Sequence, residues 1–157
     1  MDLGLRDKVI MAAATRGLGF AIARAVDLEG ARVSIASPTE SRIHEAASKL
    51  REETRLEVIP CVFDAVDGDS IVAWFQDACS GFGGVDGLVV NASGPPTGGF
   101  DDFTDQDWQD AFELTLLSST RMIRAVLPSM RQRGGGSIVT VTSSSVKDPI
   151  EFFCCRM

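Results

Sequence analysis

The chain has 157 residues, of which 45% are hydrophobic and 24% charged, and its formal net charge is −7. This length and composition are typical of one globular domain with its own core. The negative charge argues against nucleic acid and anionic membranes as partners, because both are bound through basic patches. No apolar run approaches the roughly 20 residues of a membrane span, and the first residues lack the layout of a signal peptide. We therefore expect a cytoplasmic protein.

Two predicted strand–helix pairs open the chain. Residues 8–13 form a short apolar run, and the helix predicted at 17–30 ends at Gly30. Its apolar face is assigned to Leu18, Ile22, Ala25 and Val26. Residues 31–36 are the second predicted strand. The helix predicted at 40–53 has apolar side chains at helical spacing, namely Ile43, Ala46, Ala47 and Leu50.

The same alternation continues to residue 142. We predict a strand at 56–63, a helix at 69–79, a strand at 85–92, a helix at about 104–133 and a strand at 137–142. The long helix begins at Thr104-x-x-Asp107, which resembles a capping box. We expect Pro128 to kink it and the triple glycine at 134–136 to end it.

This order of elements predicts an α/β fold. Strands that are apolar on both faces and separated by helices of ten or more residues indicate a parallel sheet covered on both sides. We predict a Rossmann-like, doubly wound sheet of about five strands in one nucleotide-binding domain, residues 1–150, followed by an atypical tail at 151–157. Ligands of such sheets bind beyond the carboxyl ends of the strands.

The segment after the first predicted strand has a pattern that suits a phosphate. Gly17 and Gly19 open a helix, where glycine lets the backbone approach a pyrophosphate and the helix terminus offers free N–H groups. The alternative is an ordinary tight turn. The position between a strand and a helix in the first βα unit favours phosphate binding.

Taken together, the strand ends resemble the short-chain dehydrogenases/reductases, in particular 3-oxoacyl-acyl-carrier-protein reductases and related carbonyl reductases, over residues 6 to about 150. The family's first turn usually reads Thr-Gly-x-x-x-Gly-x-Gly. Here it is matched by Ala12 through Gly19, with Ala13 in place of the first glycine. The family's Asn-Asn-Ala-Gly appears as Val90-Asn91-Ala92-Ser93, and "RAVLPSM" and "GGGSIVTVTSS" match its long helix and fifth strand.

The resemblance implies a nicotinamide cofactor and hydride transfer with a small carbonyl or secondary alcohol as substrate. The cofactor would be held by Ala13, Thr15, Arg16, Gly17, Leu18, Gly19, Ser37, Asp64, Asn91 and Ala92. Of these, Asp64 matches the residue that holds the adenine. NAD is usually recognised by an acid about 20 residues past the glycine turn, but the second strand ends in Ala36-Ser37-Pro38. Arg16 can pair with a 2′-phosphate, so we expect NADP(H) rather than NAD(H); the alternative is a solvated Arg16.

The catalytic positions match the family only in part. The resemblance implies that Ser143 polarises the substrate oxygen, unless it merely satisfies backbone groups at a strand end. The family's tyrosine and lysine, in Tyr-x-x-x-Lys, do not follow, and the chain contains no tyrosine. The family's relay asparagine falls on Thr115. No metal site is expected, because the four cysteines form no C-x-x-C pair and there is one histidine.

The tail "EFFCCRM" does not resemble the family segment before the catalytic helix. We interpret it as a frameshift, a truncated reading frame or an atypical family member. Three functions stay open: an oxidoreductase, a nucleotide-binding module without chemistry, and a truncated, poorly folded product. The fifth strand would lie at a sheet edge, and an unpaired edge promotes self-association. We therefore expect a homo-oligomer.

Overall fold

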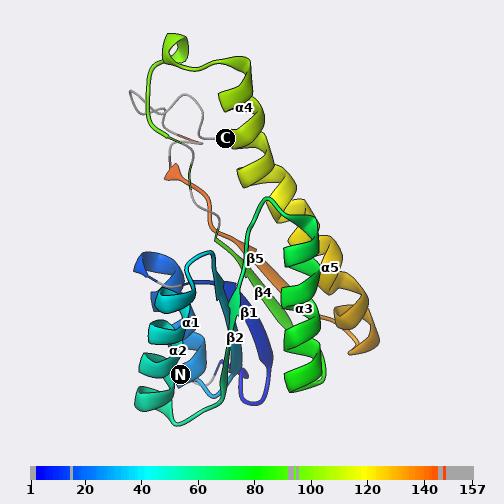
Figure 1. Cartoon of the computed structure of the whole chain (residues 1–157). Coiled ribbons are helices and arrows are strands. Elements are labelled where there is room, and N and C mark those ends of the chain that lie inside the picture. The colour runs from blue at the N-terminus through cyan, green and yellow to red at the C-terminus, as the bar shows by residue number, and fades with distance from the viewer. Residues whose placement is uncertain (1–2, 15, 92–93, 95, 145–146, 148–157) are drawn as a thin grey trace.

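The computed structural model describes residues 3–14, 16–91, 94, 96–144 and 147 (Figure 1). Its five parallel strands lie in the order β3-β2-β1-β4-β5. They are β1 (Val9–Ala13), β2 (Arg32–Ser37), β3 (Val58–Val62), β4 (Gly87–Val90) and β5 (Ser137–Thr140). The predicted doubly wound Rossmann-like sheet is confirmed, with β1 at its centre.

Helices cover both faces of this sheet. The covering helices are α1 (Gly17–Leu28), α2 (Glu40–Thr54), α3 (Gly68–Phe82) and α5 (Ser118–Gln132). A short 3-10 turn, η1 (Phe100–Asp102), and α4 (Asp105–Phe112) precede α5, and α4 extends away from the sheet (Figure 1). Figure 1 places α1 and α2 on one face and α3 and α5 on the other. Within the part of the chain that the structure describes, none of the helices has the length and hydropathy to span a lipid bilayer.

Side chains of β1 alternate between two cores, as expected for a strand that is buried on both faces. Val9 and Met11 join the core beneath α3 and α5, whereas Ile10 and Ala12 join the core beneath α1 and α2. Few polar side chains are buried among the described residues. One of them is Ser34 of β2, whose Oγ accepts a hydrogen bond from the indole N–H of Trp74 at 2.9 Å.

The predicted apolar face of α1 is confirmed for Ile22 and Val26, which are partly buried and pack against the core beneath α1 and α2, and is wrong for Leu18 and Ala25, which are exposed. Leu18 is 59% exposed, and the buried residues of this helix are Gly19, Ala23 and Asp27. The two small residues bring the helix axis close to the sheet, which a large side chain at either position would prevent. As a result the carboxyl group of Asp27 is buried, and neither of its oxygens has a hydrogen-bond partner among the described residues.

The helix predicted at about 104–133 forms, but it is not regular. Thr104 caps α4 with the predicted capping box, in which the backbone N–H of Thr104 donates to Asp107 Oδ2 at 2.8 Å and Thr104 Oγ1 accepts from the Asp107 N–H at 3.3 Å. Between α4 and α5 the chain makes a π-helical segment, η2 (Glu113–Leu117). Pro128 lies within α5. The irregularity therefore lies at η2, about three turns before the proline.

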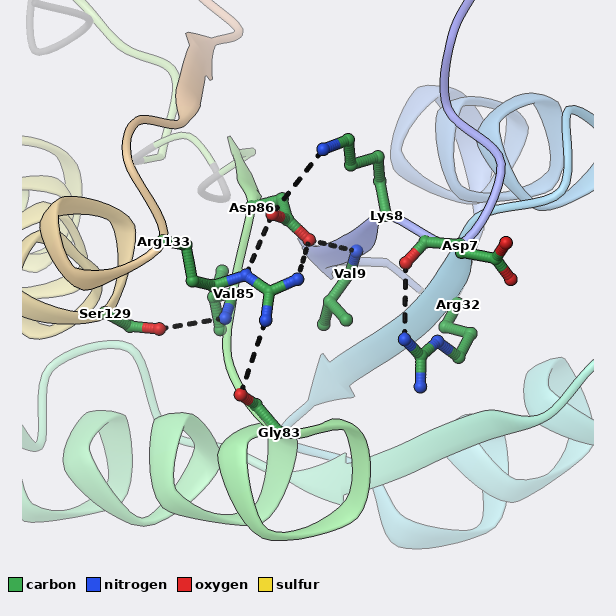
Figure 2. Close-up of polar contacts among 9 residues, drawn as sticks. All are labelled: Asp7, Lys8, Val9, Arg32, Gly83, Val85, Asp86, Ser129 and Arg133. Carbon is green, nitrogen blue, oxygen red and sulfur yellow. Dashed lines mark hydrogen bonds and ion pairs between the residues drawn. The ribbon is translucent and has the colours of Figure 1, made fainter.

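A carboxylate joins three segments at the amino-terminal edge of the sheet (Figure 2). Asp86, just before β4, accepts hydrogen bonds from the backbone N–H of Val9 and from Nε and Nη2 of Arg133, each at 2.9 Å. Lys8 Nζ lies 4.0 Å from Asp86 Oδ1. Since Arg133 follows α5, this one side chain holds the start of β1, the start of β4 and the end of α5 together.

Candidate functional site

A cavity of about 290 Å³ opens at the carboxyl ends of the strands, where a ligand is expected in this class of sheet. Its walls come from every segment that follows β1, β2, β3 and β4, and from the long helix. The residues that line it are Ala13, Ala14, Arg16, Ala36, Ser37, Pro38, Phe63, Asp64, Ala65, Asn91, Leu114 and Met122. Segments far apart in sequence thus converge on one hollow.

The two glycines of the first turn, Gly17 and Gly19, are needed for different reasons. Gly17 has φ +57°, in the left-handed region, and a Cβ there would meet nothing within 4 Å. Glycine is favoured at position 17 by the backbone conformation alone. A Cβ on Gly19 would lie 2.6 Å from Asn91 Nδ2 and 2.8 Å from the Ala13 carbonyl oxygen. Gly19 therefore lets α1 approach the ends of β1 and β4.

Asn91 connects the first and fourth strand ends. Its Nδ2 donates to the carbonyl oxygen of Ala13 at 3.4 Å, and its side chain is half-buried in the wall of the cavity. The amide group thereby stabilises the turn that opens α1. The resemblance to the family had pointed to Asn91. Only the structure shows that its hydrogen-bond partner is the backbone carbonyl of Ala13.

The end of β2 carries no carboxylate. Ser37 is buried, lines the cavity, and accepts a hydrogen bond through Oγ from the Thr39 N–H at 3.3 Å. Arg16, at the amino-terminal cap of α1, lines the same cavity and is exposed. The cavity therefore has Arg16 in its lining, and the end of β2 has no carboxylate that would repel a 2′-phosphate on the ribose of a nucleotide.

The third strand ends in a tightly hydrogen-bonded turn. The backbone N–H of Asp64 donates to Ser70 Oγ at 2.9 Å, and Asp64 Oδ1 accepts from the Val66 N–H at 3.1 Å. The preceding residue, Phe63, is buried and packs against Trp74 with ring centroids 4.9 Å apart. This packing fixes the floor of the cavity beside Asp64.

The long helix contributes apolar side chains to the cavity, which motif matching did not identify. Leu114, in η2, and Met122, in α5, both line it. Thr115 does not, and its Oγ1 donates to the Ala111 carbonyl at 2.6 Å within the helix. Only the positions of η2 and α5 beside the sheet show which face of this helix meets the ligand site.

The remaining predicted site residues are not gathered at the cavity. Gly17, Leu18 and Gly19 shape the turn but are not among the residues that line the cavity, and neither is Ser143, which follows β5 and is half-buried. Thr15 and Ala92 lie outside the described residues. No group of three or more His, Cys, Asp or Glu side chains suited to a metal ion occurs in the described ranges.

The sheet order, with helices on both faces, defines a Rossmann-like α/β fold, and the cavity opens at its strand ends. A family model described as short chain dehydrogenase matches residues 7–155. The chain belongs to the short-chain dehydrogenase family.

Two curated relatives illustrate the likeness. The chain is 36% identical over 143 residues to a protein of Streptomyces virginiae named as a ketoacyl reductase of the monensin polyketide synthase, covering 90% of this chain and 54% of the relative. It is 34% identical over 149 residues to dehydrogenase/reductase SDR family member 4 of Homo sapiens, covering 92% of this chain and 52% of that protein. The chain spans about half the length of these relatives.

Solved structures of reductases have the same fold as this chain. L-sorbose reductase from Gluconobacter frateurii, in a crystal structure complexed with NADPH and L-sorbose, superposes with a TM-score of 0.95 at 31% identity. The match covers 99% of this chain and 60% of that one.

Proposed function

We propose that the chain binds NADP(H) and belongs to an oxidoreductase that moves a hydride between the nicotinamide and a small carbonyl compound or secondary alcohol. The observation that carries the proposal is the cavity at the four strand ends, with a glycine-opened helix on one side and Asp64 on the other. Relatives named as reductases support the reaction class, including ketoacyl reductase, which agrees with the resemblance to 3-oxoacyl-acyl-carrier-protein reductases.

The preference for NADP(H) rests on charge. Arg16 lines the cavity, and β2 ends at Ser37 without a carboxylate. A 2′-phosphate gains a cation at this place, whereas the 2′-hydroxyl of NAD lacks its usual acidic acceptor. The L-sorbose reductase that this chain resembles was crystallised with NADPH.

A titration of the purified chain with NADPH and NADH tests the preference. We expect tighter binding of NADPH, and Arg16→Met should weaken NADPH binding roughly three- to tenfold while leaving NADH unchanged, because Arg16 is exposed and its charge is screened. Arg42→Met, an exposed change on α2, is the matched control. Equal affinities that are insensitive to Arg16→Met would refute the NADP(H) assignment.

A second candidate function is nucleotide binding without catalysis by these 157 residues. It is favoured by the absence of tyrosine from the sequence. It is also favoured by the Thr115 hydroxyl, which donates its hydrogen bond to the Ala111 carbonyl within the same helix. General acid–base groups typically contribute about 10²–10⁴-fold to a rate. We expect the chain to bind cofactor without measurable oxidation of NADPH by carbonyl compounds. Turnover that Ser143→Ala abolishes would instead support catalysis by this chain.

Two further parts of the proposal concern assembly and location. In the described sheet β5 is the last strand, and Val139 on it is 52% exposed. A second copy of the chain at this edge would cover it, so we propose a homo-oligomer; sedimentation as a monomer would contradict this. We also propose a cytoplasmic location, supported by the free thiols of Cys61 and Cys79.

A further inference from the structure

Arg121 links the long helix to the turn that follows β3. Its Nη1 donates to the Val66 carbonyl oxygen at 3.1 Å and lies 2.7 Å from Oε2 of Glu113. Glu113 opens the π-helical segment η2, and Arg121 lies in the first turns of α5. One guanidinium group therefore contacts both an irregular stretch of helix and a turn 55 residues away in sequence.

Arg121 and Asp64 are bonded to the same residue, Val66, through its two adjacent peptide groups. Val66 donates its N–H to Asp64 Oδ1 at 3.1 Å and accepts from Arg121 through its carbonyl group. The two bonds fix Val66 from both sides. Asp64, in turn, lines the cavity, and its own N–H is held by Ser70 Oγ at 2.9 Å.

The same helix also reaches the cavity directly. Met122, the neighbour of Arg121, and Leu114, the neighbour of Glu113, both line it. The Glu113–Arg121 pair therefore spans the stretch of helix that forms one cavity wall, and Arg121 connects this wall to the turn after β3. π-helical segments often occur at functional sites because they displace side chains from the regular helical pattern.

We infer that Arg121 is a positioning residue for the cofactor: through the backbone of Val66 it holds Asp64 in place for the adenosine half of the nucleotide, and through Glu113 it ties that turn to η2. This inference rests on the proposed cofactor binding. Arg121 itself does not line the cavity, so its effect reaches the ligand only through the turn.

Three variants separate positioning from general stability. Arg121→Met keeps the aliphatic stem and removes both polar contacts. Arg121→Lys keeps the charge, but a single ammonium group does not reproduce the two contacts of the guanidinium. Arg124→Met is the matched control, since Arg124 is an exposed residue of the same helix.

For ligand binding, the full chain is titrated with NADPH, with adenosine 2′,5′-bisphosphate as the adenosine half, and with nicotinamide mononucleotide. We expect Arg121→Met to weaken the first two roughly three- to tenfold and to leave the third unchanged, because the lost contacts are partly solvent-exposed. Arg121→Lys should recover part of the lost affinity, and Arg124→Met should bind the three ligands as the wild-type protein does. Equal weakening of all three ligands, or no weakening, overturns the inference.

Hydrogen exchange of the ligand-free protein gives a readout that does not depend on the cofactor. We expect the amides of Val66 and Asp67 to exchange faster in Arg121→Met, while amides of the central strand β1 keep their protection. Unchanged exchange at Val66 and Asp67 would refute the linkage itself. If the unchanged protein binds none of the three ligands, the proposed cofactor function fails and the positioning role fails with it, whereas faster exchange would still establish the contact with the turn.

Discussion

Replacing Asp86 with alanine should destabilise the protein substantially at neutral pH. The carboxylate accepts three hydrogen bonds of 2.9 Å, from the Val9 N–H and from two nitrogens of Arg133. Its side chain is only 11% exposed. Alanine leaves the guanidinium group and the N–H at the start of β1 without their acceptor, and it disconnects the end of α5 from the sheet (Figure 2).

The magnitude follows from the character of these bonds. A hydrogen bond to a charged group contributes about 1.5–3 kcal/mol net. The side chain of Arg133 is 31% exposed and that of Lys8 is 51% exposed, so water replaces part of what they lose. We therefore expect a loss of about 2–4 kcal/mol in the free energy of unfolding, or about 5–15 °C in Tm for a domain of this size.

The effect should depend on pH in a defined direction. Burial opposes ionisation of Asp86, but the hydrogen bonds from Arg133 and Val9 and the charges of Arg133 and Lys8 outweigh it and hold the pKa below the ordinary value of 3.8. A lowered pKa in the folded state means that the stabilisation is complete above the unfolded value and is lost as pH falls through the folded value. The difference between the two proteins should therefore shrink below about pH 4.

Urea unfolding at about pH 7, and then at steps down to about pH 3, measures both quantities. Asp101→Ala, at an exposed position in η1, should change the unfolding free energy by less than about 0.5 kcal/mol. Combining Asp86→Ala with Arg133→Met should give a coupling of about 1 kcal/mol or more, since the two residues share their bonds. A loss below about 1 kcal/mol without coupling would show that solvent substitutes for the carboxylate, and would refute the reasoning.

Two other substitutions test the packing of α1. Gly19→Ala places a Cβ 2.8 Å from the carbonyl oxygen of Ala13, a backbone atom of the central strand, so we expect urea unfolding to show a loss of about 1–3 kcal/mol, together with weaker binding of NADPH beside the displaced Asn91. An unchanged unfolding curve would mean that the helix shifts freely. Asp27→Asn should stabilise the protein by roughly 1–2 kcal/mol at neutral pH, because burial raises the pKa of this carboxyl more than the nearby Thr54 side chain lowers it, and ionising the carboxyl in the folded state costs free energy. The gain should vanish below about pH 4, where the carboxyl is protonated in both states; equal stability of the two proteins at neutral pH would contradict it.

Sequence motifs predicted several of the residues that line the cavity, in each case near the end of a strand. Gly17 and Gly19 followed from the turn between β1 and α1, and Asp64 and Asn91 from the family pattern. Asp64 and Asn91, with Ala13, Arg16 and Ser37, do line one cavity. The residues that were missed, such as Phe63, Leu114 and Met122, are ordinary core types whose place in the site depends on what packs beside them.

The sequence predicted the helix α1 more accurately than it predicted which residues of that helix are buried. The spacing of Leu18, Ile22, Ala25 and Val26 indicated a helix correctly, and Ile22 and Val26 do pack against the core, but the fully buried positions are Gly19, Ala23 and Asp27. Hydrophobicity favours the larger side chains, whereas close approach of helix and strand favours the smaller ones. The geometry of the turn at Gly17 and Gly19 selects the second arrangement and buries Asp27 as a consequence.

The sequence by itself determined the alternation of strands and helices, the capping box at Thr104 and the end of the sheet at which a ligand site would form. These features depend on side-chain periodicity and on backbone preferences over a few residues, which are local properties. Tertiary structure alone decided the contacts that join distant segments: Asp86 with Arg133, Arg121 with Val66, and Trp74 with Ser34. Such contacts depend on how the helices lie on the sheet, and that packing is the outcome of the whole chain folding.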